Sequence, residues 1–475
     1  MNYEEARAYL DSRVSYEKRG MPESTELRLD RMVTLLEAIG SPHADFPIIH
    51  VAGTKGKGTT STMIASMLTG TGRKVALHTS PHFERVEERA VISGEPIPGD
   101  RFTRLVEEIA SVVEEIDAKL APDQPGLTFF EITIALAMLY FSREQVDAAV
   151  VEVGMGGRLD STNVVIPVVS VITSISFDHT NRLGNTLAAI AREKAGIIKT
   201  GRPVVSGVVK EEPASVIREV CRHLHAPLRE AGPDFVDQYH SKGLAGGRVE
   251  VSTWRRSWPP LDVALPGRHQ GANIALAAAT CDTLEELGWT LPTEQLKQGL
   301  RLCRVPGRIE TIRRHPLVIT DVAHNEASAS ALVAAIPSRP EIPPSSPSPP
   351  RVLIFGSSVD KDWRAMLAIL LPHFSHAILA RYVAHGRAVE PSTMVEDASR
   401  AGIPVLTAET PARAWEEALR LAGTTEEPQE PASSDLDVAP LPDEPMICIT
   451  GSFFLVAEMR TMMPLAEASV RPISS

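Results

Sequence analysis

The chain has 475 residues, which is too long for one compact core and predicts two or three domains. Its 48 basic and 60 acidic side chains give a formal net charge of −12, which argues against a broad nucleic-acid interface. Hydrophobic residues make up 43% of the chain and charged residues 23%, the balance of an ordinary globular protein. An anionic substrate would therefore need a local basic site.

Cysteine usage and the apolar segments bear on the compartment. The four cysteines are far apart and form no C-x-x-C pair, which argues against a disulfide scaffold or a zinc site and fits a reducing compartment. The first ten residues, MNYEEARAYL, lack the apolar core of a secretory signal. The longest apolar run, residues 132–141, is too short to span a bilayer. We expect a cytoplasmic protein without a membrane partner.

Short β-branched runs alternate with helical stretches through the first half of the chain. The predicted strands cover 47–53, 74–80, 147–154 and 168–176, and the predicted helices cover 59–68, 101–119, 128–143 and 269–288. Strands without a polar face, separated by helices, indicate a parallel sheet that is covered on both sides. We expect an α/β fold whose N-terminal domain is a doubly wound, mostly parallel sheet of the P-loop type.

A second series of strands and helices begins near residue 309 and predicts a smaller, Rossmann-like α/β domain at the C-terminus. Two stretches near 337–350 and 424–445 interrupt it. They are rich in proline, serine and acidic residues, which is typical of flexible surface insertions. Pro306-Gly307 interrupts the pattern of elements, so we place a boundary there. The predicted domains are residues 1–304 and 305–475.

The stretch HVAGTKGKGTTSTMI, residues 50–64, has the strand, glycine-rich turn and helix of a phosphate loop but not the usual spacing. In the pattern G-x-x-x-x-G-K-[ST], counting from Gly53 puts Thr59 where the lysine should be. Such a turn still points backbone N–H groups at a ligand, and the helix start adds partial positive charge. Lys57 can reach the β- and γ-phosphates. A tight turn with a solvated lysine is the weaker alternative.

The spacing G-T-x-G-K-G-[ST] resembles the ATP loop of the Mur ligase superfamily, and most closely that of its folate branch, the folylpolyglutamate and dihydrofolate synthases. Further stretches carry the same resemblance in the family's order, among them LHTSPHFERVEERAVISGEPI, VVEVGMGGRLDSTNVV, LPGRHQGANIALA, VPGRIE and ITDVAHN. The resemblance implies an ATP-dependent ligase of folate biosynthesis that adds L-glutamate to a folate-type carboxylate. ATP would phosphorylate the carboxylate, the glutamate amine would attack the acyl phosphate, and phosphate would leave.

The resemblance also implies which residues bind ATP, the co-substrate. In the glycine-rich loop they are Gly53, Thr54, Lys55, Gly56, Lys57, Gly58, Thr59 and Thr60. Asn273 would contact adenine, Arg308 the phosphates and Asp321 the ribose. His324 would lie near the γ-phosphate, and Lys57, Lys194 and His324 would be catalytic. Arg308 and Asp321 follow the predicted boundary, so we expect ATP to bind between the domains and closure to couple binding to catalysis.

The implied metal site would hold one or two Mg²⁺ ions on Ser80, Glu152 and His179, joined by Lys194 as a carbamate formed from CO₂. Each residue has a plain structural alternative: a turn cap for Ser80, an ion pair for Glu152, a loop contact for His179 and a solvated helix lysine for Lys194. Their places near the carboxyl ends of predicted parallel strands favour the metal site. A carbamate would add carboxylate-like oxygens that suit Mg²⁺.

For the pterin-bearing substrate, the resemblance points to Arg28, Asp30, Phe130, Glu131, Arg158, Leu159 and Asp160. Phe130 lies on an apolar helix, where core packing is the alternative to ligand contact. The R-L-D stretch at 158–160 resembles the bifunctional bacterial enzymes, which act on dihydropteroate and on tetrahydrofolate polyglutamates. A monofunctional folylpolyglutamate synthase is the alternative. The family suggests a monomer whose partners are small molecules: ATP, L-glutamate and dihydropteroate or a reduced folate.

Two residues depart from the family's pattern, and two other classes of protein compete with the folate branch. Lys55 stands where relatives usually carry Asn, and Glu326 stands where they usually carry Pro; neither change removes a catalytic group. Cell-wall Mur ligases carry a UDP-binding domain ahead of the ATP loop, and 52 residues precede Gly53, so we expect the folate branch. The other rival is a non-catalytic nucleotide-binding protein. The presence of the metal-ligand residues and of Lys194 argues against it.

Overall fold

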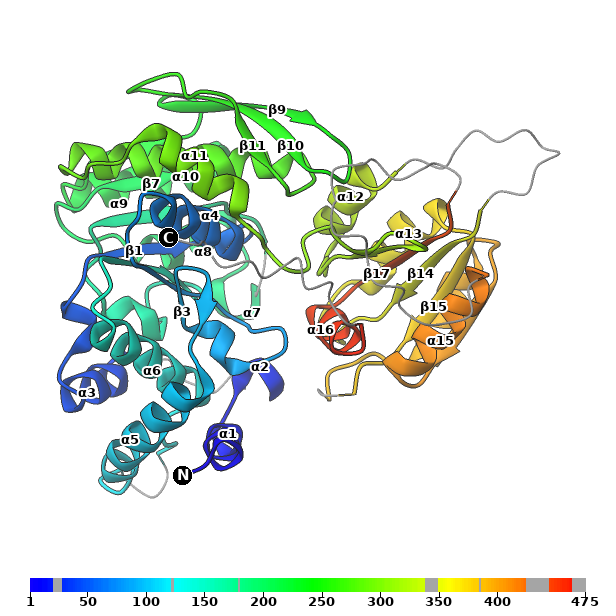
Figure 1. Ribbon diagram of the computed structural model, residues 1–475, viewed down its shortest axis with the longest axis horizontal. Coiled ribbons are helices and arrows are strands. Elements are labelled where there is room, and N and C mark those ends of the chain that lie inside the picture. The colour runs from blue at the N-terminus through cyan, green and yellow to red at the C-terminus, as the bar shows by residue number, and fades with distance from the viewer. Residues whose placement is uncertain are drawn as a thin grey trace. The chain divides into compact units, whose positions relative to one another are not determined.

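The computed structural model describes residues 1–19, 28–120, 124–177, 180–337, 349–383, 386–423 and 444–463. They form two compact units, and each has its own sheet (Figure 1). The first unit comprises Met1–Gln238, Val249–Asp262 and Gly271–Cys303, and the second comprises Tyr239–Arg248, Val263–Gln270 and Arg304–Ser475. Two short segments of the second unit thus precede the boundary at 304/305, which stays a prediction.

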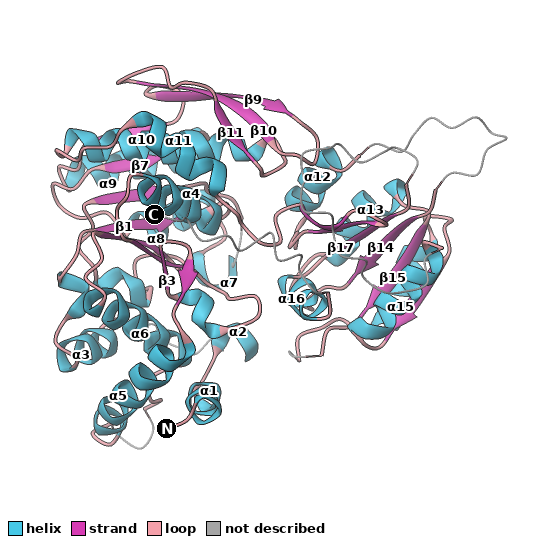
Figure 2. Ribbon diagram, viewed as in Figure 1, coloured by secondary structure: helices cyan, strands magenta, loops and turns pink. Residues whose placement is uncertain are grey.

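The described part of the first unit contains an eight-stranded sheet in the order β4-β3-β2-β5-β1-β6-β7-β8. Its strands lie among the helices of the unit (Figure 2). The strands are β1 (Ile48–Ala52), β2 (Val75–His78), β3 (Val91–Ile92), β4 (Glu95–Pro96), β5 (Ala148–Glu152), β6 (Val169–Ile172), β7 (Val204–Ser206) and β8 (Leu228–Glu230). Strands β2, β5, β1, β6, β7 and β8 run parallel, whereas β3 and β4 form an antiparallel edge. Every residue of the central strand β1 is buried, as in a sheet covered on both faces.

Helices cover both faces of this sheet, which confirms the doubly wound α/β architecture (Figure 1). On one side lie α4 (Lys57–Gly70), α10 (His269–Glu286) and α11 (Thr293–Leu302), and on the other lie α3 (Asp30–Ala38), α5 (Gly99–Asp117) and α6 (Phe129–Arg143). The remaining helices of the unit are α1 (Tyr3–Ser12), α2 (Tyr16–Arg19), α7 (Thr180–Leu183), α8 (Leu187–Ala195) and α9 (Glu211–His223), with short 3-10 turns η1 (Pro42–Ala44), η2 (Val86–Arg89) and η3 (Ser161–Val164).

Local sequence explains why these helices form and which face they bury. Helix α5 buries Phe102, Leu105, Val106, Ile109 and Val113, whose spacing makes one apolar stripe on a 3.6-residue period. Helix α6 begins after Thr128, whose hydroxyl accepts the Glu131 N–H at 3.3 Å while the Glu131 carboxylate accepts the Thr128 N–H at 2.8 Å. Both helices pack into one core against β1, β2 and β5.

The four strands predicted in the first half of the chain are all longer than those observed, and the last one by the most. The sequence predicts a strand over 168–176, but β6 ends at Ile172. Residues 174–176 leave the sheet because they bond to the glycine-rich loop instead: the Thr54 N–H donates to the Ser174 carbonyl at 2.7 Å, and the Ser176 N–H donates to the Thr54 hydroxyl at 3.1 Å.

A three-stranded sheet in the order β11-β10-β9 follows in the chain. Its strands are β9 (Phe235–Ser241), β10 (Gly247–Thr253) and β11 (Leu261–Val263). Asp282 of α10, fully buried, anchors the segment after β10. Its Oδ2 accepts from the Thr253 hydroxyl at 2.6 Å and from the Trp258 indole N–H at 3.0 Å, and Arg256 Nη2 lies 2.5 Å from Oδ1. A buried carboxylate is thereby paired and hydrogen-bonded, as burial requires.

The described part of the second unit contains a six-stranded sheet in the order β12-β13-β17-β14-β15-β16. The strands are β12 (Glu310–Arg313), β13 (Leu317–Thr320), β14 (Arg351–Phe355), β15 (His376–Ala380), β16 (Val405–Ala408) and β17 (Met446–Thr450). Strand β12 pairs antiparallel to β13, and the other pairs are parallel. The helices are α12 (Glu326–Ala335), α13 (Trp363–Leu370), η4 (Leu371–His373), α14 (Pro391–Ser399), α15 (Pro411–Leu421) and α16 (Phe453–Thr461). The predicted C-terminal α/β domain is confirmed.

Two further predictions from the sequence concern the proline-rich insertions and membrane-spanning helices. The predicted insertions near 337–350 and 424–445 fall for the most part outside the described residues. Within the described ranges, none of the helices combines the length and the apolar character that crossing a membrane requires.

Candidate active site

The glycine-rich loop between β1 and α4 has a backbone that glycine adopts easily and other residues do not. Gly53 has φ 152° and Gly56 has φ 81°. A Cβ atom on Gly53 would lie 1.9 Å from Thr173 Oγ1, and one on Gly56 would lie 2.6 Å from Asn273 Oδ1. Helix α4 begins directly after Gly56, and the first N–H groups of a helix have no partner within it. The loop therefore presents amides and a helix start, which is the geometry that binds phosphate.

Residues Thr173 and Ser174, directly after β6, hold this loop through its main chain. The Lys55 carbonyl accepts hydrogen bonds from the Thr173 hydroxyl at 2.7 Å and from the Ser174 hydroxyl at 3.1 Å. The Lys55 N–H donates to Ser174 Oγ at 3.1 Å. Sequence reasoning missed both residues. The available signal was a pair of hydroxyl side chains at the carboxyl end of a predicted parallel strand next to the loop strand.

Glu152, Ser80 and the start of α4 meet at the carboxyl edge of the sheet. Glu152 is the last residue of β5 and is 5% exposed. Its Oε2 accepts the Ser80 N–H at 3.1 Å, and a Cβ on Gly58 would lie 3.3 Å from the same oxygen. Two of the predicted metal ligands are thus neighbours beside the phosphate loop. The third, His179, lies outside the described residues.

Lys194 lies in the last turn of α8 and is 4% exposed. Its Nζ donates to the Gly53 carbonyl at 2.7 Å. The turn after β5 packs against the same end of α8, because a Cβ on Gly157 would lie 3.1 Å from Lys194 Cα. The predicted carbamate lysine is therefore a buried residue beside the loop and not a solvated helix lysine.

The turn after β5 brings Phe130 and Asp160 together. A Cβ on Gly154 would lie 2.4 Å from Phe130 Cζ and 3.2 Å from Asp160 Oδ2. Asp160 is 5% exposed and accepts the Met155 N–H at 2.9 Å and the Thr162 N–H at 3.0 Å, so it also organises this turn. Burial raises the pKa of the Asp160 carboxyl above its usual range.

The other predicted substrate contacts are dispersed. Arg28 and Asp30 form an exposed ion pair at 3.0 Å, and exposed Arg158 pairs with Glu193 at 2.9 Å. Leu159 is half-buried. Glu131 is 2% exposed, and besides capping α6 its carboxylate pairs with Arg31 at 3.1 Å. The structure gives these residues structural contacts without bringing them into one cluster.

Three predicted ATP-side residues belong to the second unit. Asp321 follows β13, is 8% exposed, and accepts the Ile309 N–H at 2.9 Å and the Ala323 N–H at 2.8 Å. Burial raises the pKa of Asp321 to about 6, although the nearby Arg308 charge lowers it. The ring of His324 donates from Nδ1 to the Val322 carbonyl at 2.9 Å, which directs Nε2 away from that carbonyl.

Asn273 of α10 belongs to the first unit. Its Oδ1 lies 3.4 Å from the Thr60 hydroxyl of α4, so the predicted adenine contact adjoins the phosphate loop.

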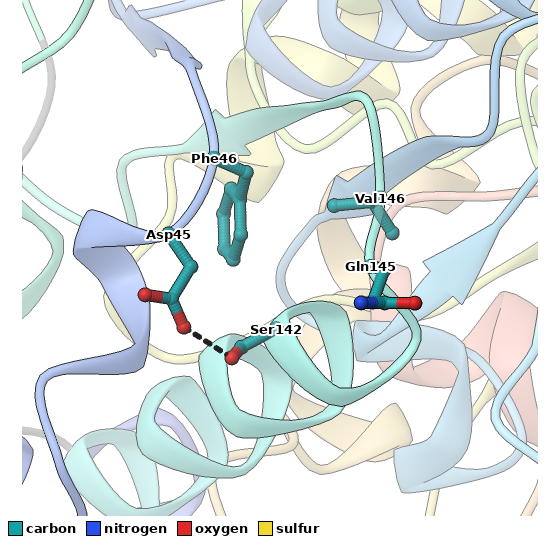
Figure 3. A pocket seen from close by; sticks show the side chains of 5 residues that line it. All are labelled: Asp45, Phe46, Ser142, Gln145 and Val146. Carbon is teal, nitrogen blue, oxygen red and sulfur yellow. Dashed lines mark hydrogen bonds between the residues drawn. The ribbon is translucent and has the colours of Figure 1, made fainter.

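A pocket at the amino ends of strands in the first sheet is lined by residues other than those of the candidate site (Figure 3). It is lined by Asp45, Phe46, Ser142, Gln145 and Val146, and the Ser142 hydroxyl donates to the Asp45 carboxylate. Its lining residues precede β1 and β5, so the pocket lies at the amino ends of these strands. Ligands of parallel α/β sheets bind at the carboxyl ends, where the loop and Glu152 lie. The candidate active site is therefore not this pocket.

Comparison with known proteins agrees with the fold. The family model of the Mur ligase middle domain matches residues 51–281, and that of the Mur ligase, glutamate ligase domain matches residues 307–426. The fold and the phosphate loop define a Mur ligase, an ATP-dependent enzyme that forms an amide bond. The class predicted from the loop spacing is confirmed.

Individual relatives narrow the class. The chain is 34% identical over 461 residues to folylpolyglutamate synthase of Lacticaseibacillus casei, covering 97% of this chain and 98% of that one. It is 37% identical over 339 residues to dihydrofolate synthase/folylpolyglutamate synthase of Bacillus subtilis, covering 71% and 76%. The structure of Mycobacterium tuberculosis folylpolyglutamate synthase complexed with ADP and AMPPCP matches with a TM-score of 0.81 at 30% identity over 97% of each chain. The chain belongs to the folylpolyglutamate synthase family.

Proposed function

We propose that this protein is an ATP-dependent ligase that joins L-glutamate to the carboxylate of a folate-type substrate through an acyl phosphate. The observation that carries the proposal is the meeting of four groups at one sheet edge: the start of α4, Glu152, Ser80 and Lys194. A carboxylate is a poor acyl donor until its oxygen becomes a good leaving group, so the enzyme's tasks are positioning and charge neutralisation.

The loop performs the first of these tasks. Its amides and the α4 start are proposed to cradle the phosphates, and Lys57, the first residue of α4, is proposed to reach the β- and γ-phosphates. Thr173 and Ser174 support this role because they fix the Lys55 main chain from two sides. A preset loop needs little reorganisation as charge develops on the transferring phosphoryl group.

The donor set around Glu152 fits magnesium. Ser80 offers a hydroxyl and Glu152 a buried carboxylate, both hard oxygen ligands, and Mg²⁺ commonly keeps several waters beside one or two protein oxygens. His179 is proposed as a further ligand. When bound, the ion would neutralise phosphate charge.

Lys194 is proposed to carry a carbamate. Carbamylation takes place on a neutral amine. The Lys194 side chain is buried, with 4% exposure. A carbamate nitrogen keeps one N–H, so the bond to the Gly53 carbonyl could persist while the new oxygens face the magnesium ligands. Those oxygens would add the second negative group that a site with one carboxylate lacks.

Arg308 is proposed to contact the phosphates, Asp321 the ribose and Asn273 the adenine, and His324 is proposed to act near the γ-phosphate. For the folate-type substrate, Phe130 and Asp160 are the best-supported contacts, because a ring for stacking and a carboxyl for hydrogen bonding meet beside Gly154. Dihydropteroate and reduced folates share the pterin head that such a corner would bind. We therefore propose both dihydrofolate synthase and folylpolyglutamate synthase activities, in a monomer.

A parallel assay tests the proposal. The purified protein is given ATP, magnesium and L-glutamate with either dihydropteroate or tetrahydrofolate, and ADP release and the product mass are measured. We expect glutamate-dependent ADP release and addition of one glutamyl group with both substrates. Activity with tetrahydrofolate but not with dihydropteroate would show that the protein is a folylpolyglutamate synthase without dihydrofolate synthase activity. ATP binding without glutamate-dependent turnover on either substrate would support a non-catalytic nucleotide-binding protein.

A further inference from the structure

Ile309, next to Arg308, has a backbone conformation that β-branched residues rarely adopt. Its φ is 49°, in the left-handed region, and its side chain is buried, with 3% exposure. Gly307, on the other side of Arg308, also has a positive φ of 62°. Strain of this kind persists where the surrounding structure over-determines it, and it concentrates at functional sites.

Three hydrogen bonds fix the main chain on both sides of Arg308. The Gly307 N–H donates to Glu310 Oε2 at 2.8 Å, and the Gly307 carbonyl accepts the Val322 N–H at 3.0 Å. The Ile309 N–H donates to Asp321 Oδ2 at 2.9 Å. The peptide units that flank Arg308 are therefore held by two carboxylates and by the strand end after β13.

Glu310 is in turn held by the last described helix. Arg460 of α16 donates from Nη1 to Glu310 Oε2, the same oxygen that accepts the Gly307 N–H. The Arg460 side chain is 5% exposed, so this pair is largely shielded from water. The Thr320 hydroxyl lies 3.5 Å from the same oxygen. Because these groups surround it, Glu310 Oε2 has little freedom to move. Its hydrogen bond with the Gly307 N–H therefore also restricts the main chain at Gly307.

We propose that Glu310 is a positioning residue that holds the main chain around Arg308 in the conformation needed to reach the ATP phosphates. This inference rests on the proposed function, because it takes Arg308 as the phosphate contact. Asp321 holds the Ile309 side of the same turn, and Arg460 fixes Glu310. A guanidinium on a preset turn loses less freedom when it binds phosphate than one on a flexible loop, so its charge stabilises the transferring group more effectively.

A double-mutant cycle between Arg308 and Glu310 tests this role. If Glu310 acts through Arg308, Glu310→Ala should lower kcat/KM for ATP by about tenfold or more in the wild-type background and by less than about twofold in the Arg308→Ala background. The melting temperature should fall by a similar amount in both backgrounds. Glu310→Gln keeps an acceptor for the Gly307 N–H and should show a smaller effect; it also serves as the cycle partner if Glu310→Ala does not fold.

Asp397 of α14 provides a matched control in the same unit. Its side chain is 22% exposed, close to 26% for Glu310, and it accepts hydrogen bonds from Arg364 and Arg400 at 3.0 Å. Asp397→Ala should lower the melting temperature without changing kcat/KM in either background. Equal losses of kcat/KM from Glu310→Ala in both backgrounds would overturn the positioning role. A lower melting temperature of Glu310→Ala with unchanged kcat/KM would overturn it as well.

Failure of the proposed function gives a different pattern. Wild-type protein would then show no glutamate-dependent turnover, and the same cycle would be measured as ATP affinity by titration calorimetry. Non-additive affinities would support the positioning of Arg308 in a nucleotide-binding protein, and additive affinities would overturn it.

Discussion

The Nζ atom of Lys194 donates a hydrogen bond of 2.7 Å to the carbonyl oxygen of Gly53, across 141 residues of chain. The bond ties the last turn of α8 to the first residue of the phosphate loop. A chemical change at Lys194 Nζ would therefore alter a hydrogen bond that holds the first residue of the loop.

Lys194→Ala should be folded and nearly inactive, with turnover reduced by about a hundredfold or more, because it loses both the loop tie and the proposed carbamate. Carbon-13 NMR with labelled bicarbonate should show a carbamate resonance in the wild type that is missing from the variant. Acetate should restore part of the activity by supplying a carboxylate.

Lys199 provides the control for this experiment, since it is a half-buried lysine in the same region of the chain and donates to the Asn163 side chain at 2.9 Å. Lys199→Ala should retain the carbamate resonance. Full activity of Lys194→Ala in CO₂-depleted buffer would contradict the carbamate.

Gly53→Ala should abolish detectable ATP binding, because the new Cβ would lie 1.9 Å from Thr173 Oγ1 and 3.1 Å from the Thr173 backbone nitrogen. Calorimetric titration with ATP measures the loss. Gly72 also has a positive φ, 83°, but has no atom within 4 Å of the Cβ position. Gly72→Ala therefore isolates backbone strain, and it should cost about 1 kcal/mol of stability and leave ATP affinity unchanged. Normal ATP binding by Gly53→Ala would remove the loop from the site.

Lys55→Asn, which restores the residue usual in the family, should leave turnover within about tenfold of wild type, because one peripheral charge in a wet site is worth roughly 1 kcal/mol. The structural reason is that Thr173 and Ser174 hold the main chain of residue 55, which both side chains share. Thr173→Val, which removes one of the two hydroxyl donors to the Lys55 carbonyl and leaves that of Ser174, should lower turnover more than Lys55→Asn does. The opposite order, measured as kcat/KM for ATP, would show that the extra lysine has become essential.

The parts of the site that the sequence predicts are those with a local signal. Strand β1, the glycines and the start of α4 are adjacent in the chain, and the meeting of Ser80 with Glu152 follows from the carboxyl ends of neighbouring parallel strands. The contacts that hold the site have no such signal. Thr173 contacts Lys55 across 118 residues, and Arg460 contacts Glu310 across 150 residues. A hydroxyl or a charge in a long sequence does not indicate its distant partner.

Asp282→Ala should reduce the free energy of unfolding by about 2–4 kcal/mol, because it removes the acceptor of the Thr253 hydroxyl and of the buried Trp258 indole N–H and leaves Arg256 paired with Glu285 at 2.9 Å but not with Asp282. Denaturant unfolding measures the change. Glu286, on the same helix, is 35% exposed and pairs with Arg229 at 3.2 Å. Glu286→Ala should cost less than about 1 kcal/mol. Equal effects of the two variants would contradict the anchoring of the segment after β10 by Asp282.

His50 should make the protein less stable as the pH falls. It is fully buried in β1, with Nε2 2.9 Å from the Thr162 hydroxyl. Burial, helped by the charge of Lys199, lowers the pKa of His50 to about 3. Below about pH 6.5 the unfolded chain binds a proton at this residue that the folded chain does not, so its contribution is present above that pH and is lost as the pH falls toward 3.

The expected loss from His50 is about 1 kcal/mol of unfolding free energy between pH 7.5 and 5.5, since one pKa unit corresponds to about 1.4 kcal/mol. His50→Gln retains a polar group for Thr162 but cannot bind the proton. It should be less stable than the wild type at pH 7.5, and the difference should narrow by that amount at pH 5.5. Urea unfolding at both values measures it. Parallel pH profiles for the two proteins would show that His50 is protonated in the folded state, which its buried position in β1 argues against.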